Sequence, residues 1–202
     1  MNGHHAAVVL AAGGSVRLGR PKQLLTHDGE TLVHRAVRLA AETSPCRLLV
    51  VVGGSAELVV PELDAASCEI VHNRQWRDGL ASSVRAAAGK FLGFDGPVLL
   101  LGCDQPALEC RHLTALLHGA AGAPSGAAAT GYGHALGVPA VVPSAWFSDR
   151  QASADQGFGP MLRALAPGAL CLIDGPDLLL DIDSPQDATD AVARGWLDAI
   201  TW

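Results

Sequence analysis

A loop rich in glycine and in cations follows the first apolar run of the chain. The run spans 8–12, and the ten residues after it hold three glycines, one serine and three cations, namely Gly13, Gly14, Ser15, Arg17, Gly19, Arg20 and Lys22. Glycines let the backbone approach an anion closely, free N–H groups point at it and fixed cations neutralise its charge. The pattern predicts a phosphate-binding loop. Its positive charge stands out because the whole chain carries a net charge of −6.

The loop fits neither of the two common phosphate-binding motifs. A P-loop requires G-x-x-x-x-G-K-[ST]. Gly14 and Gly19 have that spacing, but Arg20-Pro21 follows them and no serine or threonine comes after Lys22. A dinucleotide fingerprint requires G-x-G-x-x-G, which the residues from Gly13 onward do not match. Another kind of phosphate site is therefore expected.

Two carboxylates are candidates for holding a metal ion beside that loop. Asp104 comes just after the apolar run 98–101, and Asp183 lies in an extended acidic segment in which alternation places Asp181 and Asp183 on one side. Two carboxylates that converge on one cation, with phosphate oxygens and water completing the shell, are typical of Mg²⁺. The chain has no His/Cys cluster of the kind that binds zinc.

The elements that must position these residues alternate between strand and helix. Strands are expected over 6–12, 47–52, 69–72, 97–101, 137–142 and 169–173. Helices are expected over 30–42, 55–66, about 79–90, 109–120, part of 155–166 and 186–199, while 121–129 is loop or weak strand. This alternation predicts an α/β fold with a mostly parallel central sheet and helices on both faces. Ligands bind such sheets at the carboxyl ends of the strands, so the glycine loop and Asp104 are expected at one edge.

Composition narrows the classes of protein that fit. The 202 residues, 49% of them hydrophobic, suffice for one sizeable domain, expected over 1–202. The acidic balance argues against a nucleic-acid partner. We expect a cytoplasmic protein without a membrane partner, because no uncharged apolar run of membrane-spanning length occurs and 1–5 begins no signal peptide. The five cysteines lie far apart and contain no C-x-x-C pair, which indicates reduced thiols.

From Leu10 to Lys22 the loop resembles, position by position, the L-A-A-G-x-S-x-R-[ML]-G-x-x-K signature of the nucleotidyltransferases related to molybdenum cofactor cytidylyltransferase. The resemblance implies a Rossmann-like nucleotidyltransferase fold. The chain also resembles that family in a G-[LM]-x-x-S segment at 79–83, preceded by an amide side chain. In the family this segment contacts the nucleobase and ribose. The nucleotide-binding residues are therefore expected to be Leu10, Ala11, Ala12, Gly13, Gly14, Ser15, Arg17, Lys22, Asn73, Gly79, Ser82 and Ser83.

Further segments resemble the metal and acceptor motifs of that family. Cys-Asp-Gln-Pro at 103–106 is similar to its metal-binding D-x-P motif, and 181–187 is similar to D-[IV]-[DN]-[TS]-P-x-[DE], so Asp104 and Asp183 are the implied metal ligands. The acceptor side is implied by a G-x-P segment (Gly137, Pro139) and by a G-D-x-G-like loop (Asp155, Gly157). This chain departs from the pattern at Val138, where relatives often carry His or Asn, and at Ala154, where they carry glycine.

The expected reaction is transfer of CMP from CTP to the terminal phosphate of molybdopterin, with release of pyrophosphate and with Mg²⁺ as cofactor. Arg17, Lys22 and Asp104 are the expected catalytic residues. The expected preference for CTP is inferred from Ala12, because guanylyltransferases of the family more often carry glycine at this position. Alternatives are a guanylyltransferase of the same family, a cytidylyl- or uridylyltransferase acting on a sugar or polyol phosphate, and a non-catalytic carrier. A molybdenum hydroxylase is the partner considered as recipient of the product.

Overall fold

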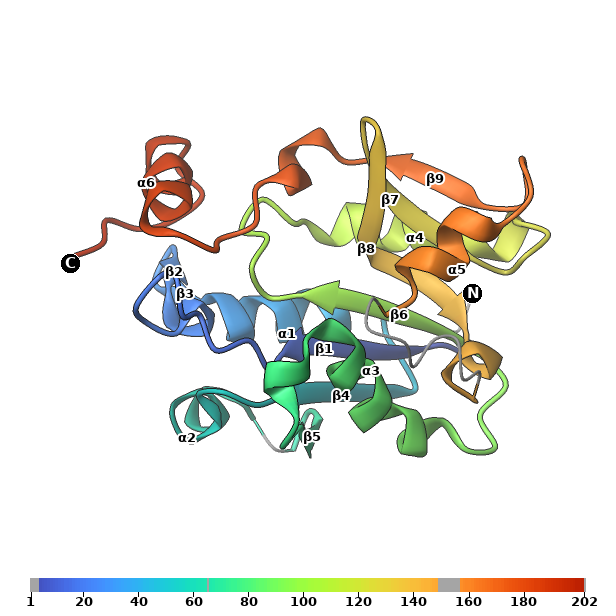
Figure 1. Cartoon of the computed structure of the whole chain (residues 1–202), viewed down its shortest axis with the longest axis horizontal. Coiled ribbons are helices and arrows are strands. Elements are labelled where there is room, and N and C mark those ends of the chain that lie inside the picture. The colour runs from blue at the N-terminus through green and yellow to red at the C-terminus, as the bar shows by residue number, and fades with distance from the viewer. Residues whose placement is uncertain (1–3, 65, 149–156, 202) are drawn as a thin grey trace.

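A seven-stranded sheet forms the centre of the protein in the computed structural model, which describes residues 4–64, 66–148 and 157–201 (Figure 1). Its strand order is β5 (Glu69–His72), β4 (Arg47–Val52), β1 (Ala6–Ala11), β6 (Pro97–Gly102), β8 (Ala135–Pro143), β7 (Ala128–Tyr132) and β9 (Cys171–Asp174). All neighbouring pairs are parallel except those that involve β8. The predicted α/β class and mostly parallel sheet are therefore confirmed.

Helices cover both faces of this sheet, as the alternation of elements predicted. Helices α1 (Leu32–Glu42), α2 (Ala56–Val59) and α4 (Cys110–Gly122) pack on one face, and α3 (Leu80–Ala88) and α5 (Gly159–Ala164) pack on the other. The β1 side chains alternate between the two layers: Val9 faces the α1 side and Val8 the α3 side, both fully buried. Within the described ranges, no helix is long and apolar enough to cross a membrane.

Several local features differ from the sequence expectation, among them the helix expected over 55–66, whose α-helical part is only Ala56–Val59 before a 3-10 turn at Val60–Glu62. In the segment 121–129, predicted as loop or weak strand, residues 121–122 end α4 and only the last two belong to β7, where Ala128 and Ala129 are fully buried and pair with β8 and β9. The last helix, α6 (Pro185–Ala193), ends well before residue 199. Its predicted start is confirmed, because Ser184 caps it in a capping box with Asp187.

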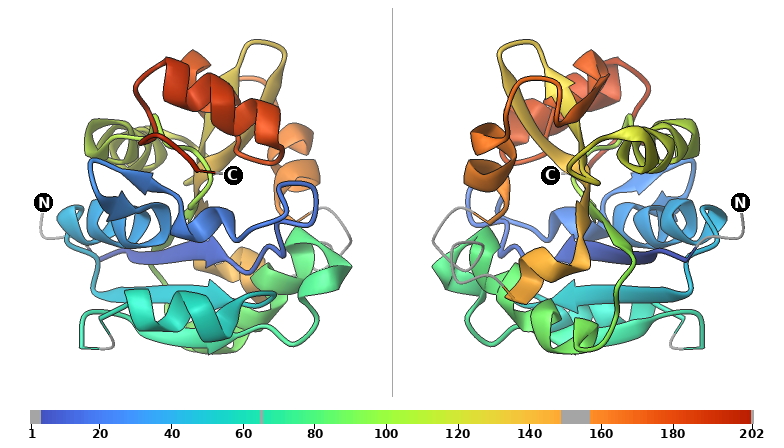
Figure 2. Two further views of the ribbon diagram at one scale, coloured as in Figure 1. Left: turned by 90° about the vertical axis from the view of Figure 1, so that its left-hand side faces the viewer. Right: turned by 90° about the vertical axis from the view of Figure 1, so that its right-hand side faces the viewer.

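Helix α6 packs against the glycine-loop region and the short β2–β3 hairpin (Thr26–His27 and Glu30–Thr31) (Figure 2). A third apolar cluster joins α6 to the segment after the glycine loop, with Leu18, Leu25 and Ile182 among its buried members. The Asp198 carboxylate accepts hydrogen bonds from the backbone N–H groups of residues 28 and 29. This packing carries the segment before α6, which contains Asp183, to the carboxyl edge of the sheet.

Candidate active site

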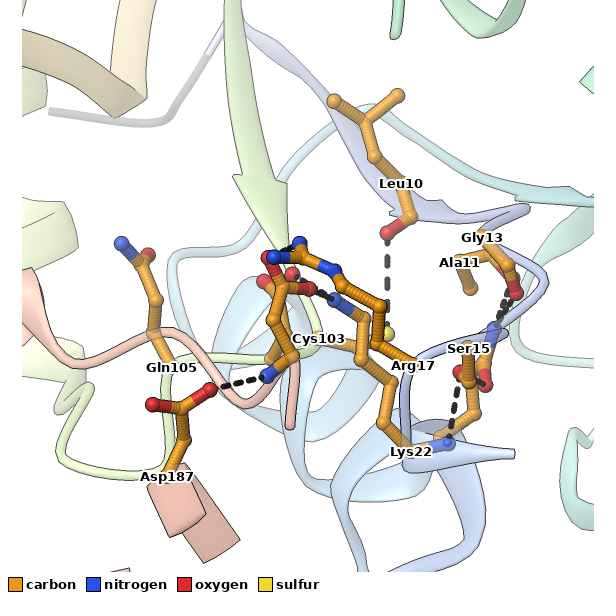
Figure 3. A network of polar contacts seen from close by, with 12 residues as sticks. Leu10, Ala11, Gly13, Ser15, Arg17, Lys22, Cys103, Gln105 and Asp187 are labelled. Atoms are coloured by element: carbon orange, nitrogen blue, oxygen red, sulfur yellow. Dashed lines mark hydrogen bonds and ion pairs between the residues drawn. The ribbon is translucent and has the colours of Figure 1, made fainter. Parts of the chain in front are cut away.

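One buried amide side chain holds the glycine loop in place through hydrogen bonds. Gln23 is fully buried, and its Nε2 donates to the carbonyl oxygens of Ala11 at 2.9 Å and Gly13 at 2.7 Å. Its Oε1 accepts from Ser15 Oγ at 3.4 Å, and Ser15 Oγ accepts from the Lys22 backbone N–H at 3.0 Å. These bonds close the loop upon itself (Figure 3). Ser15 also holds a left-handed conformation, with φ of 49°.

Two cations and two carboxylates meet beside this loop. Lys22 Nζ lies 2.7 Å from Asp104 Oδ2 and 2.7 Å from Asp183 Oδ1, and Arg17 Nη2 lies 2.6 Å from Asp183 Oδ2. Burial lowers the pKa of Lys22, but the Asp104 and Asp183 carboxylates outweigh it and hold that pKa above its usual value. The structure thus brings together four side chains that are separated by up to 166 positions in the sequence.

The carboxylate segments are also joined through their backbones. The Ile182 N–H donates to the Asp104 carbonyl oxygen at 2.9 Å, and the Asp183 N–H donates to Asp187 Oδ2 at 3.1 Å. The Asp104 carboxylate lies over Gly102, where an added Cβ would collide with its Oδ1. These backbone hydrogen bonds hold the two segments in place independently of the ion pairs with Lys22.

A cleft of about 220 Å³ opens between the glycine loop and α3. Eight of the residues predicted for the site line it: Leu10, Ala11, Ala12, Gly13, Lys22, Gly79, Ser83 and Asp104. Gln23, Trp76, Leu80 and Cys103 also line it and were not predicted as site residues. Burial raises the pKa of the Cys103 thiol to about 12, with a contribution from the Asp104 charge, so this thiol is protonated at neutral pH and unsuited to act as a nucleophile.

Trp76 forms one wall of the cleft and closes the back of the glycine loop. A Cβ added at Gly14 would collide with its indole ring, and one added at Gly54 would lie 2.8 Å from the Gly14 Cα. Glycine is therefore required at both positions for the loop to approach the β4 end. The Arg77 guanidinium stacks 4.3 Å from the Trp76 ring centre.

The predicted base-binding polar groups are largely engaged with one another. Asn73 Nδ2 donates to Ser82 Oγ at 2.8 Å and to Ser83 Oγ at 3.1 Å, and Asn73 Oδ1 accepts from the Gln75 N–H. Ser82 Oγ donates to the Gly79 carbonyl. Of these three side chains, Ser83 lines the cleft. Asn73 and Ser82 are buried behind it, where they join β5 to the start of α3.

The predicted acceptor residues are placed at the same edge, on β8 and before α5. The Val138 carbonyl accepts from Gln105 Nε2 at 3.3 Å and from the Tyr132 hydroxyl, and the Pro139 carbonyl accepts from Thr130 Oγ1 at 2.7 Å. Gly137 lies beside these residues. A Cβ added at Gly157 would lie 3.6 Å from Leu80 Cδ2 at the cleft, whereas Asp155 lies outside the described residues.

Asp181 joins the acidic side of the site without an ion pair of its own among the contacts described. Desolvation and the Asp104 charge raise its pKa to about 7. The folded protein therefore retains a proton that the unfolded chain releases between about pH 4 and pH 7, and this group makes the fold less stable as pH rises through that window.

We expect Asp181→Asn to be more stable than the wild type at pH 8 and equally stable near pH 4, because the asparagine loses no proton in either state. The difference in Tm is expected to grow between about pH 4 and pH 7 and then to level off. Thermal unfolding in EDTA across this range measures it, with the exposed Asp177→Asn as matched control. A difference in Tm that does not vary with pH would contradict the assignment.

The donor set suits a hard divalent cation. One oxygen of Asp104 and one of Asp183 each lie 2.7 Å from Lys22 Nζ, so both carboxylates can reach a single cation. No cluster of three or more His, Cys, Asp or Glu side chains arranged to hold a metal occurs in the part of the chain that the structure describes. A metal ion here would need further oxygen ligands, which phosphates and water supply.

A mostly parallel sheet with a glycine loop and a cation–carboxylate cluster at its carboxyl edge defines a nucleotidyltransferase fold. The crystal structure of a homologue of Mycobacterium tuberculosis Rv0371c from Mycobacterium sp. strain JC1 has this fold, with a TM-score of 0.77 and 27% identity over 95% of this chain and 96% of that chain. Rv0371c from M. tuberculosis H37Rv, solved in complex with manganese, gives a TM-score of 0.73 at 21% identity over 94% and 98% of the two chains.

The sequence model of the MobA-like NTP transferase domain matches residues 7–168. The chain therefore belongs to this family. The bifunctional protein GlmU of Corynebacterium diphtheriae is 35% identical to it over 124 residues, which make up 57% of this chain and 26% of GlmU. The chain thus spans about a quarter of the length of the curated relatives it matches.

Proposed function

We propose that this protein transfers CMP from CTP to the terminal phosphate of molybdopterin and releases pyrophosphate, with residues 1–202 acting as one nucleotidyltransferase domain. The observation that carries the proposal is the ion-pair cluster of Arg17, Lys22, Asp104 and Asp183, two of whose members, Lys22 and Asp104, line the cleft beside the glycine loop. Nucleotide binding alone needs cations and free N–H groups. A carboxylate pair placed beside them favours metal-assisted transfer over a carrier role.

The backbone of the loop from Ala11 to Ser15 cradles the nucleotide, and Arg17 and Lys22 neutralise the triphosphate and the departing pyrophosphate. Asp104 and Asp183 would hold Mg²⁺, which supplies neutralisation of charge at the α-phosphate when bound. The manganese complex of the mycobacterial neighbour supports a divalent ion in this fold. Alignment and charge neutralisation account for most of the catalysis in such transfers.

The chemistry needs no general base. An oxygen of the acceptor monophosphate, already anionic near pH 7, attacks the α-phosphorus and forms the new phosphoanhydride. The bond between the α-phosphorus and the bridging oxygen breaks, and its electron pair leaves with pyrophosphate. No histidine lines the described cleft, and the Cys103 thiol is protonated, which agrees with a reaction that forms no covalent enzyme intermediate.

The proposed preference for cytosine over a purine base rests on the width of the cleft near Ala12. The Ala12 side chain is buried against Gly53, where an added Cβ would lie 2.9 Å from its methyl carbon and 2.7 Å from the Trp76 Cβ. The back of the cleft is thus already filled on this side, which favours a pyrimidine over a purine. The proposed acceptor site is the edge formed by Gly137, Pro139 and Gly157, for which molybdopterin is the acceptor implied by the sequence resemblance.

A thermal-shift series with CTP, GTP, UTP and ATP, each with and without Mg²⁺, tests the nucleotide. A ligand at a hundred times its Kd adds about 2.7 kcal/mol, a rise of roughly 5–10 °C for a chain of this size. We expect this rise with CTP and Mg²⁺, and pyrophosphate release once molybdopterin is added. A rise with GTP instead would indicate a guanylyltransferase, and nucleotide binding without any pyrophosphate release would indicate a carrier.

A further inference from the structure

The position expected for a metal ion is held by the chain's own ammonium group. Lys22 Nζ contacts one oxygen of Asp104 and one of Asp183 at 2.7 Å each, and the Lys22 side chain is only 12% exposed. A bound Mg²⁺ lies about 2.1 Å from its oxygen ligands. An ammonium and a divalent ion therefore cannot share the space between these two carboxylates, and at such separation they would repel each other.

The charges of the cluster also balance within the protein. Lys22 and Arg17 supply two positive charges against the two carboxylates, and Arg17 occupies the second oxygen of Asp183. A free divalent cation thus meets two carboxylates, Asp104 and Asp183, that are already paired with cations. A nucleoside triphosphate changes this balance, because its phosphates attract both cations and leave the carboxylates unpaired.

The side chain of Lys22 can leave without dismantling the site. The Lys22 backbone N–H stays bonded to Ser15 Oγ, and the Leu25 N–H stays bonded to the Lys22 carbonyl. The backbones of Asp104 and Asp183 stay held by the hydrogen bonds from the Ile182 N–H and to the Asp187 carboxylate. Only the methylene stem of Lys22 has to change rotamer for the ammonium to move from carboxylates to phosphates.

We propose that Lys22 is a resident counter-ion of the metal site, which excludes a divalent cation from the free protein until a nucleotide triphosphate draws the ammonium away. This inference rests on the proposed function, since it assigns the binding order of that same site: nucleotide, or the metal–nucleotide complex, before free metal. The order keeps the carboxylates paired in the absence of substrate. It also ties formation of the metal site to the arrival of the triphosphate.

The test is a titration of nucleotide-free protein with MnCl₂, followed by the electron paramagnetic resonance signal of free Mn²⁺. We expect Lys22→Met to bind Mn²⁺ at least about tenfold more tightly than the wild type, because Asp104 and Asp183 are left facing one another without the ammonium between them. The double variant Lys22→Met/Asp104→Asn should lose this gain, which locates the ion. Lys90→Met, which removes a surface lysine paired with Glu69, is the matched control and should equal the wild type.

The same variants are then titrated with CTP in EDTA. Lys22→Met should bind metal-free CTP at least about tenfold more weakly, since it loses a charged contact to phosphate. Opposite changes for Mn²⁺ and CTP separate this role from a merely structural one, which would weaken both. Lys22→Gln, which retains a hydrogen-bonding side chain, serves if the methionine variant does not fold.

The inference is overturned if neither Lys22→Met nor Lys22→Gln binds Mn²⁺ more tightly than the wild type. It is also overturned if the nucleotide-free wild type already binds Mn²⁺ tightly through Asp104. Its failure is distinguishable from failure of the proposed function. If the proposed function fails, the wild type releases no pyrophosphate with any nucleotide, but Lys22→Met still binds Mn²⁺ more tightly. If this inference fails, Lys22→Met binds Mn²⁺ no more tightly, but the wild type still turns over.

Discussion

Asp104→Asn is expected to lower the rate of pyrophosphate release at least about a hundredfold, which corresponds to about 3 kcal/mol of transition-state stabilisation. Asparagine keeps the shape of the side chain but removes the negative charge that would hold a metal ion at the α-phosphate. The Asp104 backbone contact to Ile182 remains, so the segment before α6 stays in place.

The measurement is turnover with CTP, Mg²⁺ and acceptor, accompanied by a thermal unfolding curve. The fold is expected to persist, because Lys22 keeps its second partner, Asp183, at 2.7 Å. The matched control is Asp177→Asn, an exposed carboxylate outside the cleft, with wild-type turnover. Turnover of Asp104→Asn close to that of the wild type would remove Asp104 from the catalytic assignment.

Gln23→Ala is expected to destabilise the protein by about 3 kcal/mol, a fall in Tm of roughly 6–12 °C. The substitution leaves the carbonyl oxygens of Ala11 and Gly13 without their donor and opens a cavity where a fully buried side chain stood. It also frees the loop backbone, so we expect CTP affinity to fall at least about tenfold.

Two comparisons separate the causes of this effect. Gln23→Leu fills most of the volume but restores no hydrogen bond, so it should recover part of the stability and none of the CTP affinity. Gln186→Ala removes an exposed glutamine on α6, whose amide bonds Asp190, and should cost only about 0.5 kcal/mol. A Gln23→Ala protein that melts and binds CTP like the wild type would show that the loop does not depend on this amide.

Much of the fold could be predicted from the sequence because its signals are local. Apolar runs bounded by glycine and proline placed β1, β4, β5 and β6 within a residue or so, and the Ser184-Pro185 pair placed the start of α6. The alternation of strands and helices then fixed the parallel part of the sheet. What local signals left undecided was β7, whose alanines and glycine have weak strand preference and adopt that form only through pairing with β8 and β9.

The sequence by itself determined the types of residue at the candidate site and the loop proposed to hold phosphate, because glycine spacing and charge are readable along the chain. Only the tertiary structure decided how those residues pair. Lys22 reaches Asp183 because the packing of α6 on the glycine-loop region closes a separation of 161 positions. Gln23 and Trp76 had no motif to mark them, since their roles consist of contacts with backbone and glycine that arise on folding. Chemical type is a property of the sequence, whereas proximity depends on the packing of the whole sheet and its helices.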